Sequence, residues 1–337
     1  MADADSTVLL FFQEPERDKW FKGDRYLKRL VKPAYSRMAH KAGVTGFAVW
    51  YKLLVTSLRY SGYTVRTNDF RYARSNPRHP VGIIGYPIIL KDWALPNPAI
   101  LGPALFDHPK LAPSLMEDPR FRSYIVTCEW MLDVFSDSYP RHTLKLWNAG
   151  IDTEREWPNT AGNAKNVDIL IYDKIRWQRE RMVPELLDPI RRFAVEQGLT
   201  YEVLRYGKYA YADYKKALSR SRLMVFLCEH ETQGMAYQEA MASNVPIVAW
   251  DPGWWADPNR LRLGVGPIRT TSVPYFDHRC GTTFRTAAEF RRAFASAWSN
   301  LSTFRPREFV EERLSLEQSA RTYASAYFEA ANRRDEC

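Results

Sequence analysis

The sequence predicts an α/β protein made of two halves, each built around a parallel sheet. Short apolar runs of strand length alternate with segments in which apolar residues recur at helical spacing, a pattern typical of parallel strands joined by helices. The 337 residues, 45% of them hydrophobic, are enough for two domains with separate cores. Residues 153–166 (TEREWPNTAGNAKN) are polar and lack an apolar period, so they are the predicted linker.

The first half, residues 1–152, opens with the strand TVLLFF. The strands predicted after it are YTVRT, PVGIIG, PAILGPALF, SYIVTC and TLKLW. A helix that Gly62 ends is predicted before YTVRT, from apolar residues at helical spacing: Phe47, Trp50, Leu53, Leu54 and Leu58. Gly43 and Gly46 precede this helix. A glycine loop at a helix N-terminus lets a ligand approach the backbone where the helix dipole favours anions, so Gly46 is a candidate binding residue.

The second half, residues 167–314, repeats the α/β alternation. Its predicted strands are VDILIYDK, TYEVLRYG, LMVFLCEH and VPIVAW, and its helices are MVPELLDPIRRFAVEQG, DYKKALSRSR and MAYQEAMAS. Capping boxes at Thr286–Glu289 and Ser315–Gln318 open two more helices, the second of them over 315–337. Ligands of open α/β sheets bind beyond the carboxyl ends of the strands, so the expected site is a cleft between two such sheets.

Composition narrows the class of protein. No apolar run approaches the roughly 18–20 residues of a membrane helix. The start, MADADSTVLLFF, lacks the leading basic residues and cleavage site of a signal peptide, so a cytoplasmic protein is expected.

The four cysteines (Cys128, Cys228, Cys280 and Cys337) form no CxxC pair and no metal-ligand spacing with histidine, so no metal site is predicted. Cys128 and Cys228 end apolar strands and are expected to be buried.

Positive charge is concentrated in residues 17–41. The net charge is +9. This segment interleaves aromatic residues with basic ones, which are Arg17, Lys19, Lys22, Arg25, Lys28, Arg29, Lys32, Arg37 and Lys41. One interpretation is a patch that attracts an anionic membrane surface, a phosphorylated acceptor or nucleic acid. The other is a solvated helical face with its aromatic residues turned inward, and the segment supports both equally.

The stretch CEHETQGMAYQEAMASNVPIVAWDPG, residues 228–253, places two carboxylates around a glycine turn. Glu231 follows a predicted strand, and Gln233–Gly234 form a turn at a helix N-terminus, where exposed amides suit a phosphate or sugar hydroxyls. Glu239 lies on the first turns of that helix and can face the same cleft. Carboxylates accept paired hydrogen bonds from vicinal diols, so one could hold a ribose and the other a hexose. Taken alone, however, this spacing is more typical of two surface glutamates near the start of a helix, where acidic residues are common.

The same stretch resembles the E-x7-E signature of retaining, GT-B-fold nucleotide-sugar glycosyltransferases of the family 4 type. The matching residues are Glu231, Gly234, Glu239, Ala240, Met241, Ala242, Pro246, Val248 and Ala249. YIVTCEWMLDVF is similar to the family's strand–helix unit, LWNAGIDTE to its interdomain segment, and GVTGFAVWYKLLVTSLRYSGYTV to the first helix of its acceptor domain. LSLEQSARTYASAYFEA is similar to its final helix. The family's paired-glycine loop is absent after TVLLFF, and Gly43–Gly46 is the nearest equivalent.

The resemblance implies a GT-B fold with two Rossmann-like domains facing a central cleft. Residues 1–152 would bind the acceptor, 167–314 would bind the nucleotide sugar, and the helix 315–337 would cross back to the first domain. Glu239 would bind the nucleotide ribose, and Glu231 the donor sugar hydroxyls. The backbone of four residues would cradle sugar and phosphate, namely Gln233, Gly234, Met235 and Ala236.

Two basic residues after the first strand of the second half, Lys174 and Arg176, would neutralise the diphosphate, with Arg179 and Arg181 in reserve. Such cations stabilise a leaving group that gains negative charge. The alternative for them is a solvated basic turn. Tyr209 or Tyr211 could stack on the nucleotide base, and core packing is an equal interpretation of both tyrosines.

The predicted activity is that of a hexosyltransferase that moves a sugar from a nucleotide diphosphate sugar to an acceptor hydroxyl, with retention and with no metal or other cofactor. The expected partners are the donor and a glycan or lipid-linked acceptor in polysaccharide synthesis. Residues 17–41 could also contact the inner face of a membrane. A nucleic-acid partner is not expected. Alternatives are an epimerase or sugar phosphorylase on the same fold, or a basic membrane- or nucleic-acid-binding protein with a degenerate fold. Intact Glu231 and Glu239 argue against a degenerate site.

Overall fold

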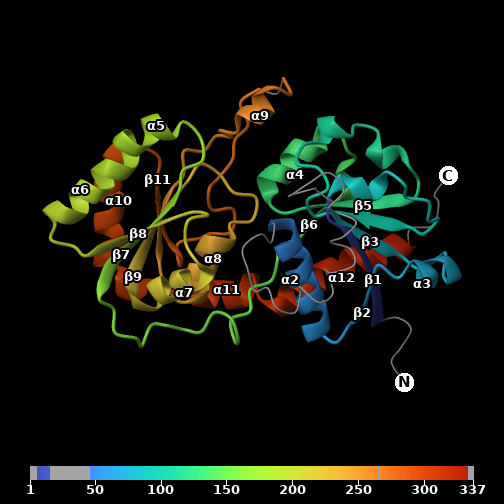
Figure 1. Ribbon diagram of the computed structural model, residues 1–337, viewed down its shortest axis with the longest axis horizontal. Coiled ribbons are helices and arrows are strands. Elements are labelled where there is room, and N and C mark those ends of the chain that lie inside the picture. The colour runs from blue at the N-terminus through green and yellow to red at the C-terminus, as the bar shows by residue number, and fades with distance from the viewer. Residues whose placement is uncertain (1–5, 16–45, 265, 333–337) are drawn as a thin grey trace, which may run out of the picture. The chain divides into compact units, whose positions relative to one another are not determined.

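The computed structural model describes residues 6–15, 46–264 and 266–332. The basic segment 17–41, Gly43 and Cys337 lie outside these ranges. The described chain divides into two compact units (Figure 1). Unit 1 comprises the residues up to Val126, Ser138–Trp147 and those from Ala320 on, whereas unit 2 comprises Thr127–Asp137 and Asn148–Ser319. Each unit carries a parallel sheet with helices around it, so the predicted α/β fold with two parallel sheets is confirmed.

The sheet of unit 1 has six parallel strands in the order β2-β1-β3-β4-β5-β6. Their bounds are β1 Thr7–Gln13, β2 Thr64–Thr67, β3 Val81–Gly85, β4 Ala99–Leu101, β5 Phe121–Val126 and β6 Leu144–Leu146. Each coincides with an apolar run that the sequence marks as a strand. Strands β1, β3 and β4 are buried over most of their length, as expected for a parallel sheet covered on both faces.

Among the described residues, the α-helices of unit 1 are α2 (Gly46–Tyr60), α3 (Phe70–Ser75) and most of α12 (Leu316–Asn332), of which Leu316–Ser319 belong to unit 2. Helix α12 packs on the centre of the sheet. The hydroxyl of Tyr327 accepts a hydrogen bond from Leu9 N at 2.9 Å and donates one to the Pro80 carbonyl. A Cβ at Gly82, in β3, would lie 2.1 Å from the Tyr323 hydroxyl, so glycine at this position lets the helix approach the strand.

The sheet of unit 2 has five parallel strands in the order β11-β10-β9-β7-β8. Their bounds are β7 Val167–Lys174, β8 Tyr201–Arg205, β9 Ser221–Cys228, β10 Ile247–Trp250 and β11 Gly281–Phe284. Strands β7 and β9 are neighbours, and Lys174 pairs in register with Cys228 at their carboxyl ends. This register decides which loops meet at the edge of the sheet.

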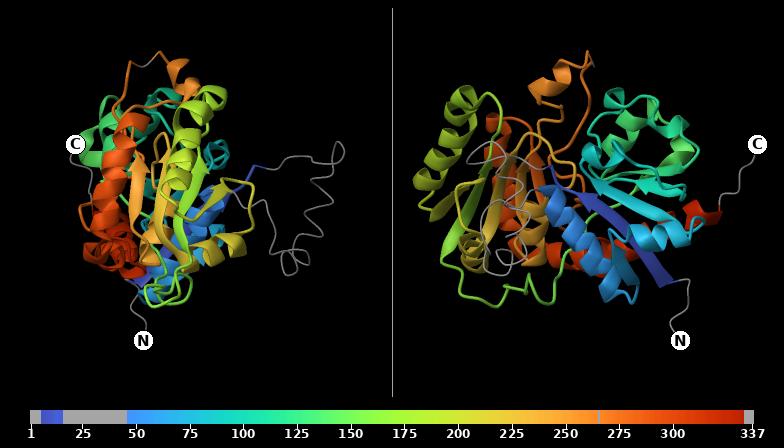
Figure 2. Two further views of the ribbon diagram at one scale, coloured as in Figure 1. Left: turned by 90° about the vertical axis from the view of Figure 1, so that its left-hand side faces the viewer. Right: turned by 45° about the vertical axis from the view of Figure 1, so that its right-hand side comes forward.

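Helices cover both faces of this sheet (Figures 1 and 2). Ile169 and Ile171 of β7 pack with α6 and α10, whereas Leu170 and Tyr172, which point to the other face, pack with α7, α8 and α11. The helices of unit 2 are α4 Glu129–Ser136, α5 Arg179–Met182, α6 Asp188–Glu196, α7 Tyr211–Arg220, α8 Met235–Ala242, α9 Pro258–Leu261, α10 Ala287–Ser299 and α11 Pro306–Arg313. A π-helical turn, Val183–Leu187, joins α5 to α6.

Several local predictions need correction. The expected capping box at Thr286 does not form, because the Thr286 side chain caps nothing and the Glu289 carboxylate accepts from Arg285 N at 2.8 Å instead. The Ser315 hydroxyl, by contrast, accepts from Gln318 N at 3.3 Å, as expected. Strand β11 and helix α11 were not predicted. Buried Cys128 and Cys228 agree with the sequence-based expectation.

The polar segment 153–166 belongs to unit 2. Within it, Trp157 is buried in the core of that unit, and the Thr160 hydroxyl donates to the Ser243 carbonyl at 2.6 Å. The segment therefore packs on the unit that follows it in the sequence. No helix in the described ranges is long and apolar enough to cross a membrane.

Candidate functional site

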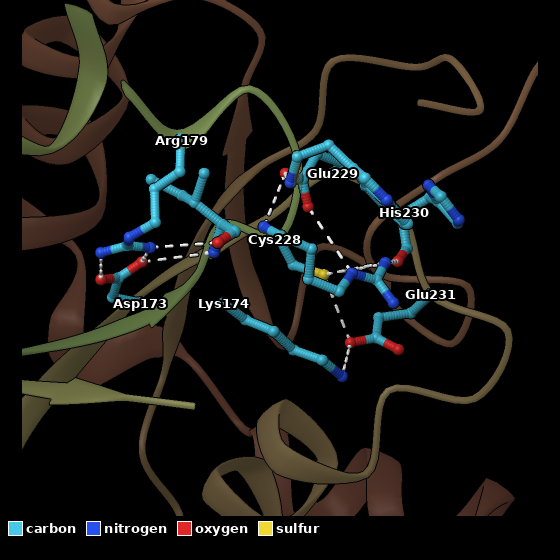
Figure 3. Close-up of polar contacts among 10 residues, drawn as sticks. Asp173, Lys174, Arg179, Cys228, Glu229, His230 and Glu231 are labelled. Atoms are coloured by element: carbon cyan, nitrogen blue, oxygen red, sulfur yellow. Dashed lines mark hydrogen bonds and ion pairs between the residues drawn. The ribbon is translucent and has the colours of Figure 1, made fainter. Parts of the chain in front are cut away.

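The candidate site lies in unit 2, where β7 and β9 end side by side. Lys174 is the last residue of β7, and the loop 229–234 leads from the end of β9 into α8. Parallel neighbours end at the same edge of a sheet, so residues about 55 positions apart in sequence come together there. The basic residues after β7 and the acidic residues after β9 therefore face one another, as Figure 3 shows for Lys174 and Glu231.

Lys174 and Glu231 form an ion pair at this edge. The Lys174 ammonium donates to Glu231 Oε1, and the two side chains are only 13% and 9% exposed. Cys228 Sγ also lies 3.3 Å from Glu231 Oε1, and the centre of the Tyr206 ring lies 4.7 Å from Lys174 Nζ. Burial is the largest single influence on Lys174 and opposes its charge, but attraction to Glu231 and Cys228, together with the hydrogen bond to Glu231, outweighs burial and raises the pKa of the lysine. Lys174 is therefore a firmly charged cation.

Arg176 is held by two residues of the β9–α8 loop. Its Nη2 donates to the His230 carbonyl at 2.5 Å, and its Nε lies 3.7 Å from Glu229 Oε2. Its guanidinium also lies 4.3 Å from the centre of the Trp177 ring, within reach of a cation–π interaction. The Arg176 side chain is 31% exposed, so it keeps access to solvent.

The two reserve arginines stand apart from this group. Arg179 forms a bidentate ion pair with the buried Asp173, in which Nη1 donates to Oδ1 at 2.8 Å and Nη2 donates to Oδ2 (Figure 3). Arg181 is 62% exposed, and its Nε lies 3.7 Å from Glu185 on the same helical segment. Of the four candidate cations, Lys174 and Arg176 are thus the two that contact the β9–α8 loop.

Gly234 gives the loop its entry into α8. Its φ of +80° lies in the region that favours glycine, and a Cβ there would lie 2.0 Å from Cε1 of Tyr237. The first amides of α8, which include those of the partly exposed Met235 and Ala236, have no acceptor within the helix and can bind an anion.

The Gln233 side chain is occupied with holding the loop in place. It is 1% exposed, accepts from Ala149 N at 2.9 Å, and donates to the Gln238 side chain at 2.9 Å. The Gln233 carbonyl also accepts a hydrogen bond from the Gln238 side chain at 2.6 Å, so the backbone N–H is the group that the predicted ligand role would use, and that role stays a prediction.

Glu239 lies on α8 among tyrosines. It is 8% exposed and accepts a hydrogen bond from the Tyr211 hydroxyl at 3.2 Å. Burial raises the pKa of Glu239 to about 8, although the Tyr211 bond works in the opposite direction. Tyr211 is 51% exposed. Tyr209 instead packs on the core, with its hydroxyl 2.5 Å from that of Tyr172.

Gly46 belongs to unit 1 and begins α2 there. A Cβ at this position would meet nothing within 4 Å, so no steric requirement for glycine is present in the described surroundings. Its role as a binding residue stays a prediction.

Sequence reasoning missed the residues that fix the loop around Glu231. Glu229 accepts two amides of the β7–α5 loop, and the Trp130 indole donates to the Glu231 carbonyl at 2.9 Å. On the other side, Glu231 N donates to the Thr271 carbonyl at 3.0 Å. The signal for Glu229 was an acid directly after a buried strand, at the same sheet edge as Lys174. Trp130 gave no such signal.

Comparison with known proteins finds solved structures of similar fold, but no match by sequence. No family model matches the sequence, and no curated protein matches it significantly. AviGT4, a glycosyltransferase involved in avilamycin A biosynthesis, is a similar solved structure, with a TM-score of 0.57, 12% identity and 96% of this chain matched to 98% of its own. The α,α-trehalose 6-phosphate synthase of Burkholderia multivorans has a TM-score of 0.51 and 10% identity, with 96% of each chain covered.

A third similar structure is a mutant of S. aureus TarM in complex with fondaparinux, α-GlcNAc-glycerol and UDP, with a TM-score of 0.50 and 14% identity. The match covers 73% of this chain but only 55% of TarM, so this chain spans about half the length of that protein. At these identities the likeness shows the fold alone. The chain therefore has the predicted GT-B fold, which it shares with these proteins.

Proposed function

We propose that this protein is a glycosyltransferase that moves a sugar from a nucleotide diphosphate sugar to an acceptor hydroxyl. One observation carries the proposal: a cationic pair, a glycine-led helix N-terminus and two buried glutamates gather at the carboxyl edge of the unit 2 sheet. Ligands of open α/β sheets bind at such an edge. The bound UDP in the TarM structure supports a nucleotide-containing donor.

Each group has a role that its chemistry suits. Glu239 accepts hydrogen bonds from the ribose diol, and Glu231 accepts them from the sugar hydroxyls. The backbone at 233–236 binds sugar and phosphate. Lys174 and Arg176 neutralise the diphosphate, where negative charge grows as the sugar departs. Tyr209 and Gly46 remain proposed ligand contacts, the former near the base.

The reaction is proposed to proceed with retention, the departing phosphate taking the acceptor proton, in glycan or glycoconjugate synthesis. The two cations supply the positive charge in this scheme, so activity should survive excess EDTA. Nucleoside diphosphate release tests this, measured with a panel of sugar donors that carry the nucleotide identified by the ligand screen below, and with a panel of sugar acceptors. Loss of activity in EDTA with recovery in Mg²⁺ would contradict the metal-independent scheme.

The first test is a ligand screen. Thermal shift and calorimetry with UDP, GDP, ADP, TDP and CMP are run on the native protein, on Glu239→Ala, and on the exposed control Glu185→Ala. A nucleotide at 100 times its Kd should stabilise the fold by about 2.7 kcal/mol. We expect one nucleoside diphosphate to stabilise the native protein and the control, and to stabilise Glu239→Ala much less. If no nucleotide shifts the native protein, the proposal fails.

A further inference from the structure

The β9–α8 loop contributes a second carboxylate that the proposed roles do not use. Glu229 directly follows β9, and its side chain is 4% exposed. Its Oε1 accepts hydrogen bonds from two consecutive amides of the β7–α5 loop, Arg176 N at 2.9 Å and Trp177 N at 3.0 Å. A carboxylate that accepts hydrogen bonds from two backbone amides fixes the path of that loop.

The same carboxylate lies against the guanidinium that the loop carries. Glu229 Oε2 accepts no hydrogen bond within the described chain, and Arg176 Nε lies 3.7 Å away from it. Arg176 is anchored a second time where its Nη2 donates to the His230 carbonyl at 2.5 Å. Glu229 thus acts on Arg176 twice, through the main chain and through charge.

At this edge of the sheet, each of three basic residues at or after the end of β7 forms an ion pair with a carboxylate. Lys174 pairs with Glu231, Arg176 with Glu229, and Arg179 with Asp173. An incoming diphosphate therefore meets cations that already have partners. Of these carboxylates, Asp173 binds Arg179 through both of its oxygens, and Glu231 is assigned to the sugar; Glu229 has neither function.

We propose that Glu229 is the positioning residue of the anion site, holding Arg176 in place while its charge limits how tightly the site retains a diphosphate. The proposal rests on the proposed function in one respect, that the natural anion is the diphosphate of a donor. A buried negative charge beside a cation weakens the attraction of that cation for a second anion. Such a residue favours release of a charged leaving group once transfer is complete.

Two substitutions separate position from charge. Glu229→Gln keeps an oxygen for the two loop amides and removes the charge, whereas Glu229→Ala removes both. The probe is inorganic pyrophosphate in metal-free buffer, titrated calorimetrically into the native protein and each variant. Glu185→Gln is the matched control, since it removes one negative charge from a side chain that is 59% exposed.

We expect Glu229→Gln to bind pyrophosphate about tenfold more tightly than the native protein, with a steeper loss of affinity as salt rises. Glu229→Ala should bind about tenfold more weakly than Glu229→Gln, because its loop is released, and Glu185→Gln should match the native protein. Equal or weaker binding by Glu229→Gln overturns the charge role, and equal binding by the two Glu229 variants overturns the positioning role.

The pyrophosphate titration and the nucleotide screen together distinguish this proposal from the proposed function. Pyrophosphate binding that tightens in Glu229→Gln, together with no response to any nucleotide, would support the role of Glu229 and reject the nucleotide-sugar donor. Nucleotide binding without tightening in Glu229→Gln would do the reverse. Failure of every variant and of the native protein to bind pyrophosphate would reject the anion site itself. If Glu229→Ala does not fold, the comparison of Glu229→Gln with the native protein decides the charge role.

Discussion

Gly234 occupies a backbone position that a side chain cannot share. Its φ is +80°, and the Tyr237 ring comes within 2.0 Å of the place that a Cβ would take, so both features exclude alanine. We expect Gly234→Ala to lower the free energy of unfolding by about 2–4 kcal/mol, from left-handed strain plus a steric clash. Urea denaturation measures this change.

Gly253 provides the matched control for that substitution. Its φ is +85°, but a Cβ there would meet nothing within 4 Å. Gly253→Ala should therefore show the strain alone, about 1–2 kcal/mol. Equal losses in the two variants would mean that the Tyr237 ring moves aside freely, and that Gly234 is required for its backbone conformation only.

Glu239 makes the stability of the fold depend on pH. Burial raises its pKa from 4.5 to about 8, so the folded chain keeps a proton that the unfolded chain releases. The free energy of unfolding should therefore fall as pH rises from about 4.5 to about 8 and change no further above that, with respect to this group. A difference of one between the pKa of the folded and of the unfolded chain changes the free energy of unfolding by about 1.4 kcal/mol.

Glu239→Gln should lack this decline, so its stability relative to the native protein should increase between pH 5 and pH 8. Urea denaturation at pH 5.5, 7 and 8.5 measures the difference, with Glu185→Gln as a control that should follow the native protein. A constant difference between Glu239→Gln and the native protein across this range would contradict the raised pKa.

The sequence names those residues of the candidate site that a motif marks, but it gives no signal for most of the residues that hold them in place. Glu231, Gly234 and Glu239 stand in a spaced pattern, and Lys174 follows a strand, so each carries a local signal. Trp130 contacts the Glu231 carbonyl from 101 residues away. That contact depends on tertiary packing alone, which no local pattern records.

At the scale of elements, α12 depends on one of its two buried tyrosine hydroxyls. The Tyr327 hydroxyl satisfies Leu9 N and the Pro80 carbonyl, so Tyr327→Phe leaves two buried backbone groups without partners. We expect it to lower the free energy of unfolding by about 1–3 kcal/mol. The Tyr323 hydroxyl has no hydrogen-bond partner in the described part of the chain.

Tyr323→Phe is therefore the control on the same helix, one turn away. It removes a buried polar atom that has no partner among the described residues, so stability should stay the same or rise slightly. Thermal and urea denaturation of the two variants gives the comparison. A loss in Tyr323→Phe as large as that in Tyr327→Phe would show that ring packing, and not the hydrogen bonds to β1 and Pro80, anchors the helix.

Elements that lie in a predicted apolar run or helical period were predictable, even the three-residue strands β4 and β6, and elements without such a signal were not. The runs that became β1, β7 and β9 are almost entirely apolar at their centres. Strand β11, GTTF, begins with a glycine and has one apolar residue, so no apolar run marks it, and it forms because β10 offers it a partner. The failed capping box shows the same limit, since Thr286 and Glu289 have the right spacing but the carboxylate reaches a different amide.

At the scale of the whole molecule, neither unit is one continuous stretch of sequence. Unit 1 needs residues up to Val126, then Ser138–Trp147, and finally those from Ala320 on. Truncation after Ser319 should therefore damage unit 1 in particular, because it removes the helix that bonds to Leu9 and Pro80. Limited proteolysis with mass spectrometry should show new cleavage within 46–126. Unchanged resistance of that region would contradict the dependence.

The same interleaving sets an order of events on the ribosome. A nascent chain emerges from its N-terminus, yet the sheet of unit 1 acquires its last helix only after residues 148–319 have been made. At about 5–20 residues per second, synthesis of that stretch takes roughly 10–35 seconds. During that time the apolar surface of β1 and β3 lacks its covering helix, while unit 2 emerges complete up to Ser319. The half that is translated first is therefore the half that matures last, and it is the one exposed to chaperones and to aggregation during synthesis.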